Sequence, residues 1–141
     1  MATLMINNPK TGELIAIMDA TALTCLRTGA VGAIATELII NQNKLNIALI
    51  GCGKQAEYQL KCIQEVKKIN NISLYDISIK QAEKLKQKIK HIIGNVIIHD
   101  DIKKTCQTAD VIITTTPGNQ PILQQHHIPE NCLIIFCICL N

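Results

Sequence analysis

A glycine-rich turn between an apolar run and a helical pattern is the first feature of this sequence that could perform chemistry. This glycine turn consists of Gly51, Cys52, Gly53, Lys54, Gln55 and Ala56, which matches the pattern G-x-G-x-x-A. In that pattern the first glycine makes a tight turn, the second lets the backbone approach a pyrophosphate, and the small last residue lets the helix pack on the strand. The helix N-terminus adds free N–H groups and the positive end of a dipole. The turn therefore predicts a dinucleotide-binding site, and the alternative is a turn that only packs a helix on a sheet.

An acidic residue ends the next predicted strand. Asp76 follows Gly51 at about the interval expected for the acid that binds the adenosine ribose. A carboxylate accepts hydrogen bonds from a ribose 2′-OH but repels a 2′-phosphate, and no arginine follows Asp76 to receive one. The sequence thus predicts NAD rather than NADP as the cofactor. Thr114 and Thr116, at the end of a later predicted strand, are further candidates for lining the cofactor.

A single arginine lies on a long apolar segment, residues 20–40, which we expect to be a helix closely approached by its neighbours. Arg27 and Glu37 are its only charges, so the guanidinium needs an anion. That anion is either a bound carboxylate, which a guanidinium can hold with two hydrogen bonds, or the chain's own Asp19 or Glu37.

Alternating strands and helices must position these residues. Residues 3–19 predict two strands joined by a turn, ahead of the apolar helix. Further strands are expected at residues 45–51, 72–76, 95–99, 109–116 and 132–140. Helical patterns follow the first two of these, with Ser78 and Gln81 as a capping box and Asp100 as a later N-cap. This alternation predicts an α/β fold, a Rossmann-like doubly wound parallel sheet preceded by a β-hairpin and a connecting helix.

Composition argues against several other classes of protein. The net charge of +3 is dispersed and aromatic residues are 2% of the chain, so a nucleic-acid partner is not expected. The N-terminal stretch lacks a secretory pattern and no apolar run approaches a membrane span, so we expect no membrane partner and a cytoplasmic location. Seven cysteines include no C-x-x-C pair, and His126 and His127 lack a third ligand nearby, so no metal site is expected.

Several of these stretches together resemble the ornithine cyclodeaminase/mu-crystallin family. They are "DATALTCLRTGAVGAIATELI", followed by the glycine turn in "LIGCGKQAEYQL", and the later "ADVIITTTPGNQPIL". The resemblance covers nearly the whole chain to about Ile135. It is carried most specifically by the Arg-Thr-Gly-Ala stretch together with the glycine turn.

The resemblance implies a function that the residues alone do not. In such enzymes a bound NAD oxidises an amino acid to an imine, and the ornithine enzymes then cyclise it, release ammonia and return the hydride to give proline. Relatives are alanine dehydrogenases, ketimine or pyrroline-carboxylate reductases, and NADPH-linked crystallins. The arginine at the position of Arg27 holds the carboxylate of the amino acid substrate, and the intact family is expected to form homodimers.

The sequence also departs from the family pattern. Family members carry an N-terminal segment with a lysine and a second arginine, and a later segment with an acid/base aspartate, whereas no Asp follows Asp110 here. We therefore expect a truncated member without a catalytic residue of its own. Residues 1–41 would be the remnant of a substrate and dimer domain, and residues 42–141 an NAD-binding domain incomplete at its C-terminus. Two functions stay open: a fragment or half of a cyclodeaminase-class enzyme, inactive by itself, or a non-catalytic nucleotide-binding remnant.

Overall fold

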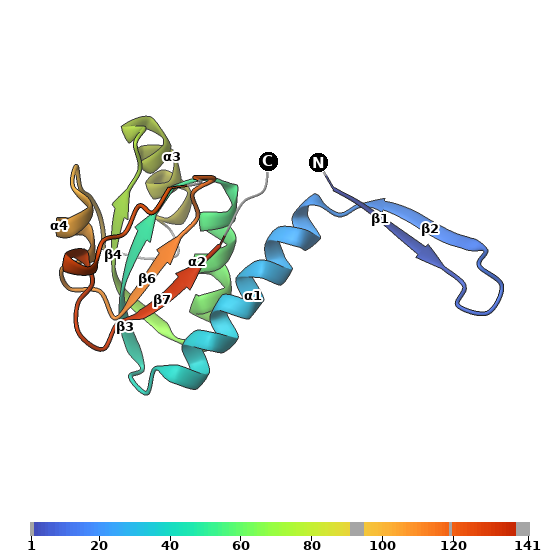
Figure 1. Cartoon of the computed structure of the whole chain (residues 1–141), viewed down its shortest axis with the longest axis horizontal. Helices are drawn as coiled ribbons and strands as arrows, with labels where there is room; N and C mark the ends of the chain where they lie inside the picture. The colour runs from blue at the N-terminus through green and yellow to red at the C-terminus, as the bar shows by residue number, and fades with distance from the viewer. Residues whose placement is uncertain (1, 91–94, 119, 138–141) are drawn as a thin grey trace.

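Five parallel strands form the central sheet, in the order β5-β4-β3-β6-β7 (Figure 1). The structure is a computed structural model that describes residues 2–90, 95–118 and 120–137. The strands are β3 (Lys44–Ile50), β4 (Lys68–Tyr75), β5 (Val96–Ile98), β6 (Val111–Thr114) and β7 (Leu133–Phe136). Each neighbouring pair is parallel, so the predicted Rossmann-like doubly wound α/β fold is confirmed.

Helices cover both faces of the sheet, because successive side chains of each strand point to opposite faces. From β3, Ile47 and Leu49 enter one apolar cluster, whereas Ala48 and Ile50 enter another. The first cluster is covered by α1 (Thr21–Ile39), α2 (Lys54–Val66) and α3 (Ile79–Ile89). The second is covered by α4 (Ile102–Cys106) and by the segment that contains the 3-10 helix η1 (Gln125–His127). Fully buried aliphatic side chains on both faces explain why the central strands read as continuous apolar runs.

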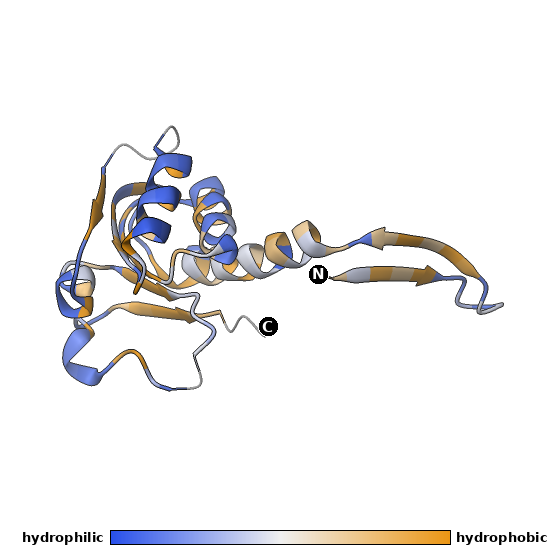
Figure 2. Ribbon diagram, turned by 90° about the horizontal axis from the view of Figure 1, so that it is seen from above, coloured by the Kyte–Doolittle hydropathy of each residue, from blue (hydrophilic) through white to orange (hydrophobic). Residues whose placement is uncertain are grey.

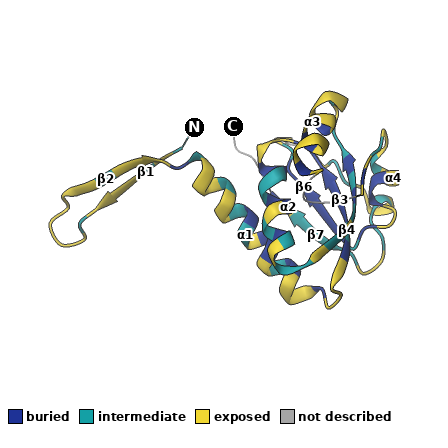
Figure 3. Ribbon diagram, turned by 180° about the vertical axis from the view of Figure 1, so that it is seen from behind, coloured by how far each residue is buried: buried dark blue, intermediate teal, exposed yellow. Residues whose placement is uncertain are grey.

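The N-terminal hairpin projects beyond the start of α1, away from the sheet (Figure 1). Its strands, β1 (Thr3–Asn7) and β2 (Leu14–Asp19), pair antiparallel as the sequence predicts. In the turn, the Asn8 Oδ1 accepts a hydrogen bond from the backbone N–H of Lys10 at 2.9 Å, and Gly12 supplies a φ of +75°. Most of the hairpin is exposed (Figure 3).

Helix α1 packs closely on α2 through small residues. A Cβ added to Gly29 would lie 2.7 Å from the carbonyl oxygen of Tyr58, so the two helices approach too closely there for any larger residue. The expected close approach is therefore confirmed. The opposite side of α1 is exposed, however, and only Gly29, Gly32, Ala33 and Thr36 of this helix are buried.

Large apolar side chains are exposed along both α1 and the hairpin, and Figure 2 shows hydrophobic residues in both strands of the hairpin. By length and composition α1 is also apolar enough to cross a membrane, in contrast to the expectation that no apolar run approaches a membrane span, but a single such helix is weak evidence because a core helix has the same properties. We define the exposed apolar face by its large side chains, which are Met5, Ile6, Leu14, Ile15, Ile17, Met18, Leu23, Leu26, Val31, Ile34, Leu38 and Ile39.

Some element boundaries differ from the prediction. Strand β4 begins at Lys68, four residues early, because its N-terminal half pairs with β3 in spite of its polar asparagines. The N-cap of α4 is Asp101, whose side chain accepts a hydrogen bond from the N–H of Lys104, so the assignment of Asp100 was wrong. Ser78 makes no side-chain capping bond at the start of α3. The predicted last strand extends beyond Phe136 into residues 138–140, which lie outside the described residues.

Candidate functional site

The glycine turn lies where β3 ends and α2 begins, at the carboxyl edge of the sheet. Gly51 has a φ of +91°, a conformation that side chains other than glycine rarely adopt. A Cβ on Gly51 would also lie 2.9 Å from both the carbonyl oxygen of Thr115 and the Cγ2 of Thr116. Its N–H donates to the carbonyl of Tyr75 at 2.8 Å, which ties the turn to the neighbouring strand. The fold therefore requires glycine at this position.

Gly53 is different, because the fold gives no reason for it to be glycine. Its φ of −77° and ψ of −169° are open to any residue, and a Cβ there would meet no atom within 4 Å. It is the N-cap of α2 and has no side-chain capping bond, which leaves the first turn of the helix without a side-chain partner. The open space above this helix terminus suits a pyrophosphate.

Among the remaining residues of the turn, some are buried in the core and one is exposed. Ala56 is fully buried in the core beneath the turn, so its small side chain allows α2 to lie close on the sheet. Gln55 is also buried, whereas Lys54 is exposed at the start of α2. The buried side chains therefore fix the backbone of the turn on the core, while its N–H groups and the cation of Lys54 face outward.

Asp76 lies beside the turn and holds it in shape. One carboxylate oxygen accepts the backbone N–H of Cys52 at 2.7 Å, and the other accepts the N–H of Ser78 at 2.8 Å. A carboxylate has about four acceptor positions, so room for hydrogen bonds from a ribose remains. The sequence predicted the proximity of Asp76 to the turn but not this bridging role.

A cavity of about 460 Å³ opens above the carboxyl ends of β3, β4 and β6. Gly51, Gly53, Asp76 and Thr116 line it, so the structure brings four of the predicted cofactor residues together. The complete lining also includes Ile50, Cys52, Tyr75, Ile77, Gln81, Ile102, Thr115, Pro117, Gly118 and Ile122. We call this space the dinucleotide cavity. Its position, outside the carboxyl ends of parallel strands, is where open α/β sheets bind ligands.

The threonines that line the dinucleotide cavity differ in part from the predicted ones. Thr114 is buried at the end of β6, where its carbonyl accepts the N–H of Cys137 at 2.9 Å, and it does not line the cavity. Thr115 does line it, and its hydroxyl donates to the carbonyl of Gly51 at 2.7 Å. Strand β6 ends at Thr114, two residues before the predicted end, so Thr115 and Thr116 belong to the segment after the strand that lines the cavity, and residue types alone cannot specify that end.

Arg27 is exposed on α1 and outside the residues that line the dinucleotide cavity. Within the described part of the chain it forms no ion pair with either Asp19 or Glu37. Asp19 instead accepts hydrogen bonds from the hydroxyl and N–H of Thr21, which lower the pKa of its carboxyl, with a smaller contribution from Lys54. Because Arg27 is exposed and has no ion pair among the described residues, its guanidinium is open to a ligand.

The thiol of Cys52 lies inside the turn and stays protonated. Burial, followed by the nearby charge of Asp76, raises the pKa of Cys52 to about 12. A neutral thiol is neither a nucleophile nor a metal ligand at physiological pH. Among the described residues, no group of three His, Cys, Asp or Glu side chains is placed to hold a metal ion.

Comparison with known proteins places this site in a family. Residues 1–137 match the model of the ornithine cyclodeaminase/mu-crystallin family. The alanine dehydrogenase of Archaeoglobus fulgidus is 35% identical over 132 residues, which are 92% of this chain and 40% of that protein. The ketimine reductase mu-crystallin of Macropus fuliginosus is 32% identical, over 86% of this chain and 38% of that protein.

Solved structures agree with the sequence comparisons. The Δ1-pyrroline-2-carboxylate reductase of Thermococcus litoralis, in complex with NADH and L-proline, has a TM-score of 0.89 and 29% identity, over 95% of this chain and 42% of that one. An archaeal alanine dehydrogenase dimer with bound NAD has a TM-score of 0.84 and 34% identity, over 92% and 40% of the two chains. This chain thus spans about two fifths of the length of these relatives. The match over almost all of its own residues shows that it belongs to the ornithine cyclodeaminase/mu-crystallin family.

Proposed function

We propose that this chain supplies the NAD(H)-binding part of an enzyme that moves a hydride between the cofactor and an amino acid or the corresponding imine. The observation that carries the proposal is the open space at Gly53, a glycine that the fold does not need, beside a turn fixed by Gly51 and Asp76. The solved relatives with NADH or NAD at comparable folds support the same choice of cofactor.

The residues of the dinucleotide cavity fit such a cofactor. The pyrophosphate would be held by the backbone N–H groups at Gly53 and Lys54, where the helix dipole of α2 is positive. Asp76 would accept hydrogen bonds from the adenosine ribose. The apolar wall made by Ile77, Ile102 and other lining residues suits the adenine ring. When bound, the cofactor supplies the hydride chemistry, and the chain positions it and excludes water from one side.

The substrate is proposed as an amino acid whose carboxylate is bound by Arg27. The exposed guanidinium forms no ion pair with any residue that the structure describes, and a planar carboxylate matches its paired N–H donors. Ornithine, converted to proline and ammonia, remains the substrate that the sequence resemblance suggests first. The 35% identity to an alanine dehydrogenase makes oxidation of alanine the second candidate.

We further propose that residues 1–41 belong to a substrate and dimer domain and residues 42–141 to the cofactor domain. The exposed apolar face of the hairpin and α1 supports a homodimer, since a second copy would remove these side chains from water. A cytoplasmic location is proposed as well, and the free thiols of Cys25, Cys52, Cys62, Cys106 and Cys132 support it. Fractionation of the source cells would test that location.

Calorimetric titration of the chain with NAD and with NADP tests the proposed cofactor. We expect saturable NAD binding at one site, tighter than NADP binding. Heats that show no NAD binding by a folded chain would contradict the proposed function. NADP binding equal to or tighter than NAD binding would contradict only the role of Asp76 in cofactor choice.

A further inference from the structure

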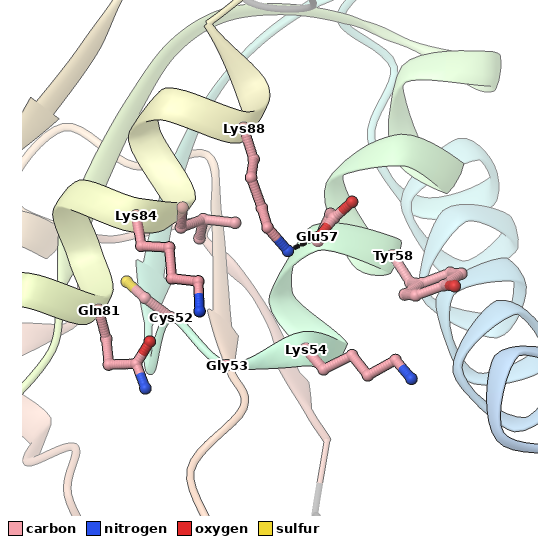
Figure 4. A pocket seen from close by; sticks show the side chains of 9 residues that line it. Cys52, Gly53, Lys54, Glu57, Tyr58, Gln81, Lys84 and Lys88 are labelled. Carbon is pink, nitrogen blue, oxygen red and sulfur yellow. Dashed lines mark hydrogen bonds and ion pairs between the residues drawn. The ribbon is translucent and has the colours of Figure 1, made fainter.

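Two further cavities accompany the dinucleotide cavity. One, of about 480 Å³, lies between α2 and α3, where Glu57 and Lys88 form an ion pair of 2.8 Å (Figure 4). It adjoins the dinucleotide cavity, because Cys52, Gly53 and Gln81 line both spaces. The other, of about 320 Å³, shares no described lining residue with either space. It lies between α4 and the segment that contains η1, and we call it the α4 cavity. Its described lining residues are Lys103, Lys104, Gln107, His126, His127, Ile128 and Pro129.

The α4 cavity is positively charged. Lys103, Lys104 and Gln107 are exposed on one side of α4, since residues three and four apart on a helix are neighbours. Lys104 forms an exposed ion pair of 3.3 Å with Asp100, a kind of contact that contributes little free energy and leaves the ammonium able to turn to another anion. Lys103 forms no ion pair with any residue that the structure describes. No Asp or Glu occurs among the described lining residues, so the charge of the two ammonium groups is not neutralised within the cavity.

The segment opposite α4 adds a further donor and an apolar surface. The Nδ1 of His127 accepts the backbone N–H of Gln124 at 3.2 Å, so a neutral imidazole carries its proton on Nε2 and offers a donor there. The ring of His126 packs edge-on against that of His127, with 4.2 Å between the ring centroids. His127, Ile128 and Pro129 are half-buried, whereas the lysines are exposed. A ligand in the α4 cavity would therefore meet cations at the surface and apolar side chains that are more buried.

We propose that the α4 cavity binds a phosphomonoester, with Lys103 as the principal contact. Such a group carries a charge of about −1.5 to −2 at neutral pH and three strong acceptor oxygens, which match two ammonium groups, an amide and an imidazole N–H. A carboxylate has one charge and two oxygens, so it would leave part of this donor set unused. The half-buried Ile128 and Pro129 suit an apolar organic part attached to the phosphate. The inference does not depend on the proposed function, because the α4 cavity lies outside the dinucleotide cavity.

The test is a titration of the isotope-labelled chain followed by heteronuclear NMR, because shifts of backbone amide signals report which site a ligand occupies. The probes are phenyl phosphate, inorganic phosphate and benzoate at low salt. We expect phenyl phosphate to shift the amide signals of residues 103–107 and 125–128 with a single dissociation constant. Inorganic phosphate lacks the apolar part and benzoate lacks the second charge, so both should bind there several-fold more weakly.

Replacing Lys103 with Gln tests the principal contact. We expect Lys103→Gln to weaken phenyl phosphate at these signals about tenfold, as for the loss of one charge-assisted hydrogen bond, and to change any shift at the glycine turn less than twofold. Lys86→Gln is the matched control, because Lys86 is an exposed lysine of α3 outside the lining of the α4 cavity. It removes the same charge and should leave the affinity within twofold.

Each contrary result overturns a defined part of the proposal. Phenyl phosphate that shifts none of these amide signals, or only those of the glycine turn, would overturn the site. Equal losses in Lys103→Gln and Lys86→Gln would show that net charge rather than the α4 cavity attracts the ligand. Benzoate that binds as tightly as phenyl phosphate would overturn the choice of a phosphate, and inorganic phosphate that does so would overturn the monoester in favour of the free ion. No NAD is added, so failure of the proposed function would leave all these results unchanged.

Discussion

The two glycines of the turn look alike in the sequence but have different physical roles. Gly51 is needed for its backbone conformation and for its clearance from Thr115 and Thr116, whereas Gly53 has an ordinary conformation and free space. Conformation and clearance depend on the folded backbone, so the sequence could predict the motif but could not separate these roles.

We expect Gly51→Ala to destabilise the chain. The substitution forces a side chain into a left-handed conformation and against the carbonyl oxygen of Thr115, and strain of this kind costs about 1–3 kcal/mol. Urea unfolding followed by circular dichroism measures the loss. Gly53→Ala is the control and should unfold within about 0.5 kcal/mol of the parent chain. Equal losses for the two variants would contradict the distinction.

Replacing Asp76 with Asn should affect both the turn and the choice of cofactor. The amide keeps one acceptor oxygen, so it cannot accept the N–H groups of both Cys52 and Ser78 as the carboxylate does. Without the negative charge, repulsion of a 2′-phosphate also disappears. We expect Asp76→Asn to bind NAD about tenfold more weakly and to lower the ratio of NAD to NADP affinity. An unchanged ratio in calorimetry would show that Asp76 does not discriminate.

At the level of elements, apolar patterns predicted the strands and helices well because burial determines both. The runs at residues 45–51 and 109–116 became central strands with fully buried side chains. Polar residues in regular structure were missed in β4. Asn71 pairs with Asn46 of β3 in spite of its low strand propensity, and the register shift in this pairing leaves Asn70 without a paired residue in β3. The choice between Asp100 and Asp101 as a cap depends on the exact start of α4, which composition does not fix.

The contact between α1 and α2 should be sensitive to the size of Gly29. A Val side chain there would collide with the carbonyl oxygen of Tyr58, a backbone atom that cannot rotate away. We expect Gly29→Val to cost about 1–3 kcal/mol or to displace α1, as overpacking usually does. Val31→Ala on the exposed side of α1 is the control. Thermal unfolding of both variants measures the difference, and equal melting temperatures would contradict the tight packing of these helices.

The whole molecule combines a well-packed sheet with an apolar extension. The hairpin and the outer side of α1 expose large aliphatic side chains. Figure 2 marks the hydrophobic residues of the hairpin strands, and Figure 3 marks most of the hairpin as exposed. The sequence indicated this helix through its composition, but its small residues suggested burial on almost all sides. Only the structure shows that the glycines face α2 and that the larger side chains face outward.

This exposed apolar face should make the chain associate in solution. Burying several aliphatic side chains against a second copy removes apolar surface from water at about 25 cal/mol per Å². We expect sedimentation velocity to show a species larger than a monomer whose share rises with concentration, and Ile17→Asp to reduce that share. The control, Ile97→Asp on the exposed edge strand β5, should leave it unchanged. A monomer at all concentrations would contradict the proposed role of this face.

The central claim is that the space at Gly53 holds the pyrophosphate of NAD. The most direct test is the dissociation constant of NAD for the parent chain and for Gly53→Val, with circular dichroism to confirm that both are folded. The Val side chain would enter only empty space in the unliganded protein but would occupy the position of the phosphate. The account predicts an unchanged fold and at least about a hundredfold weaker NAD binding, because the pyrophosphate can no longer occupy its position. Unchanged NAD affinity in a folded Gly53→Val chain would contradict it.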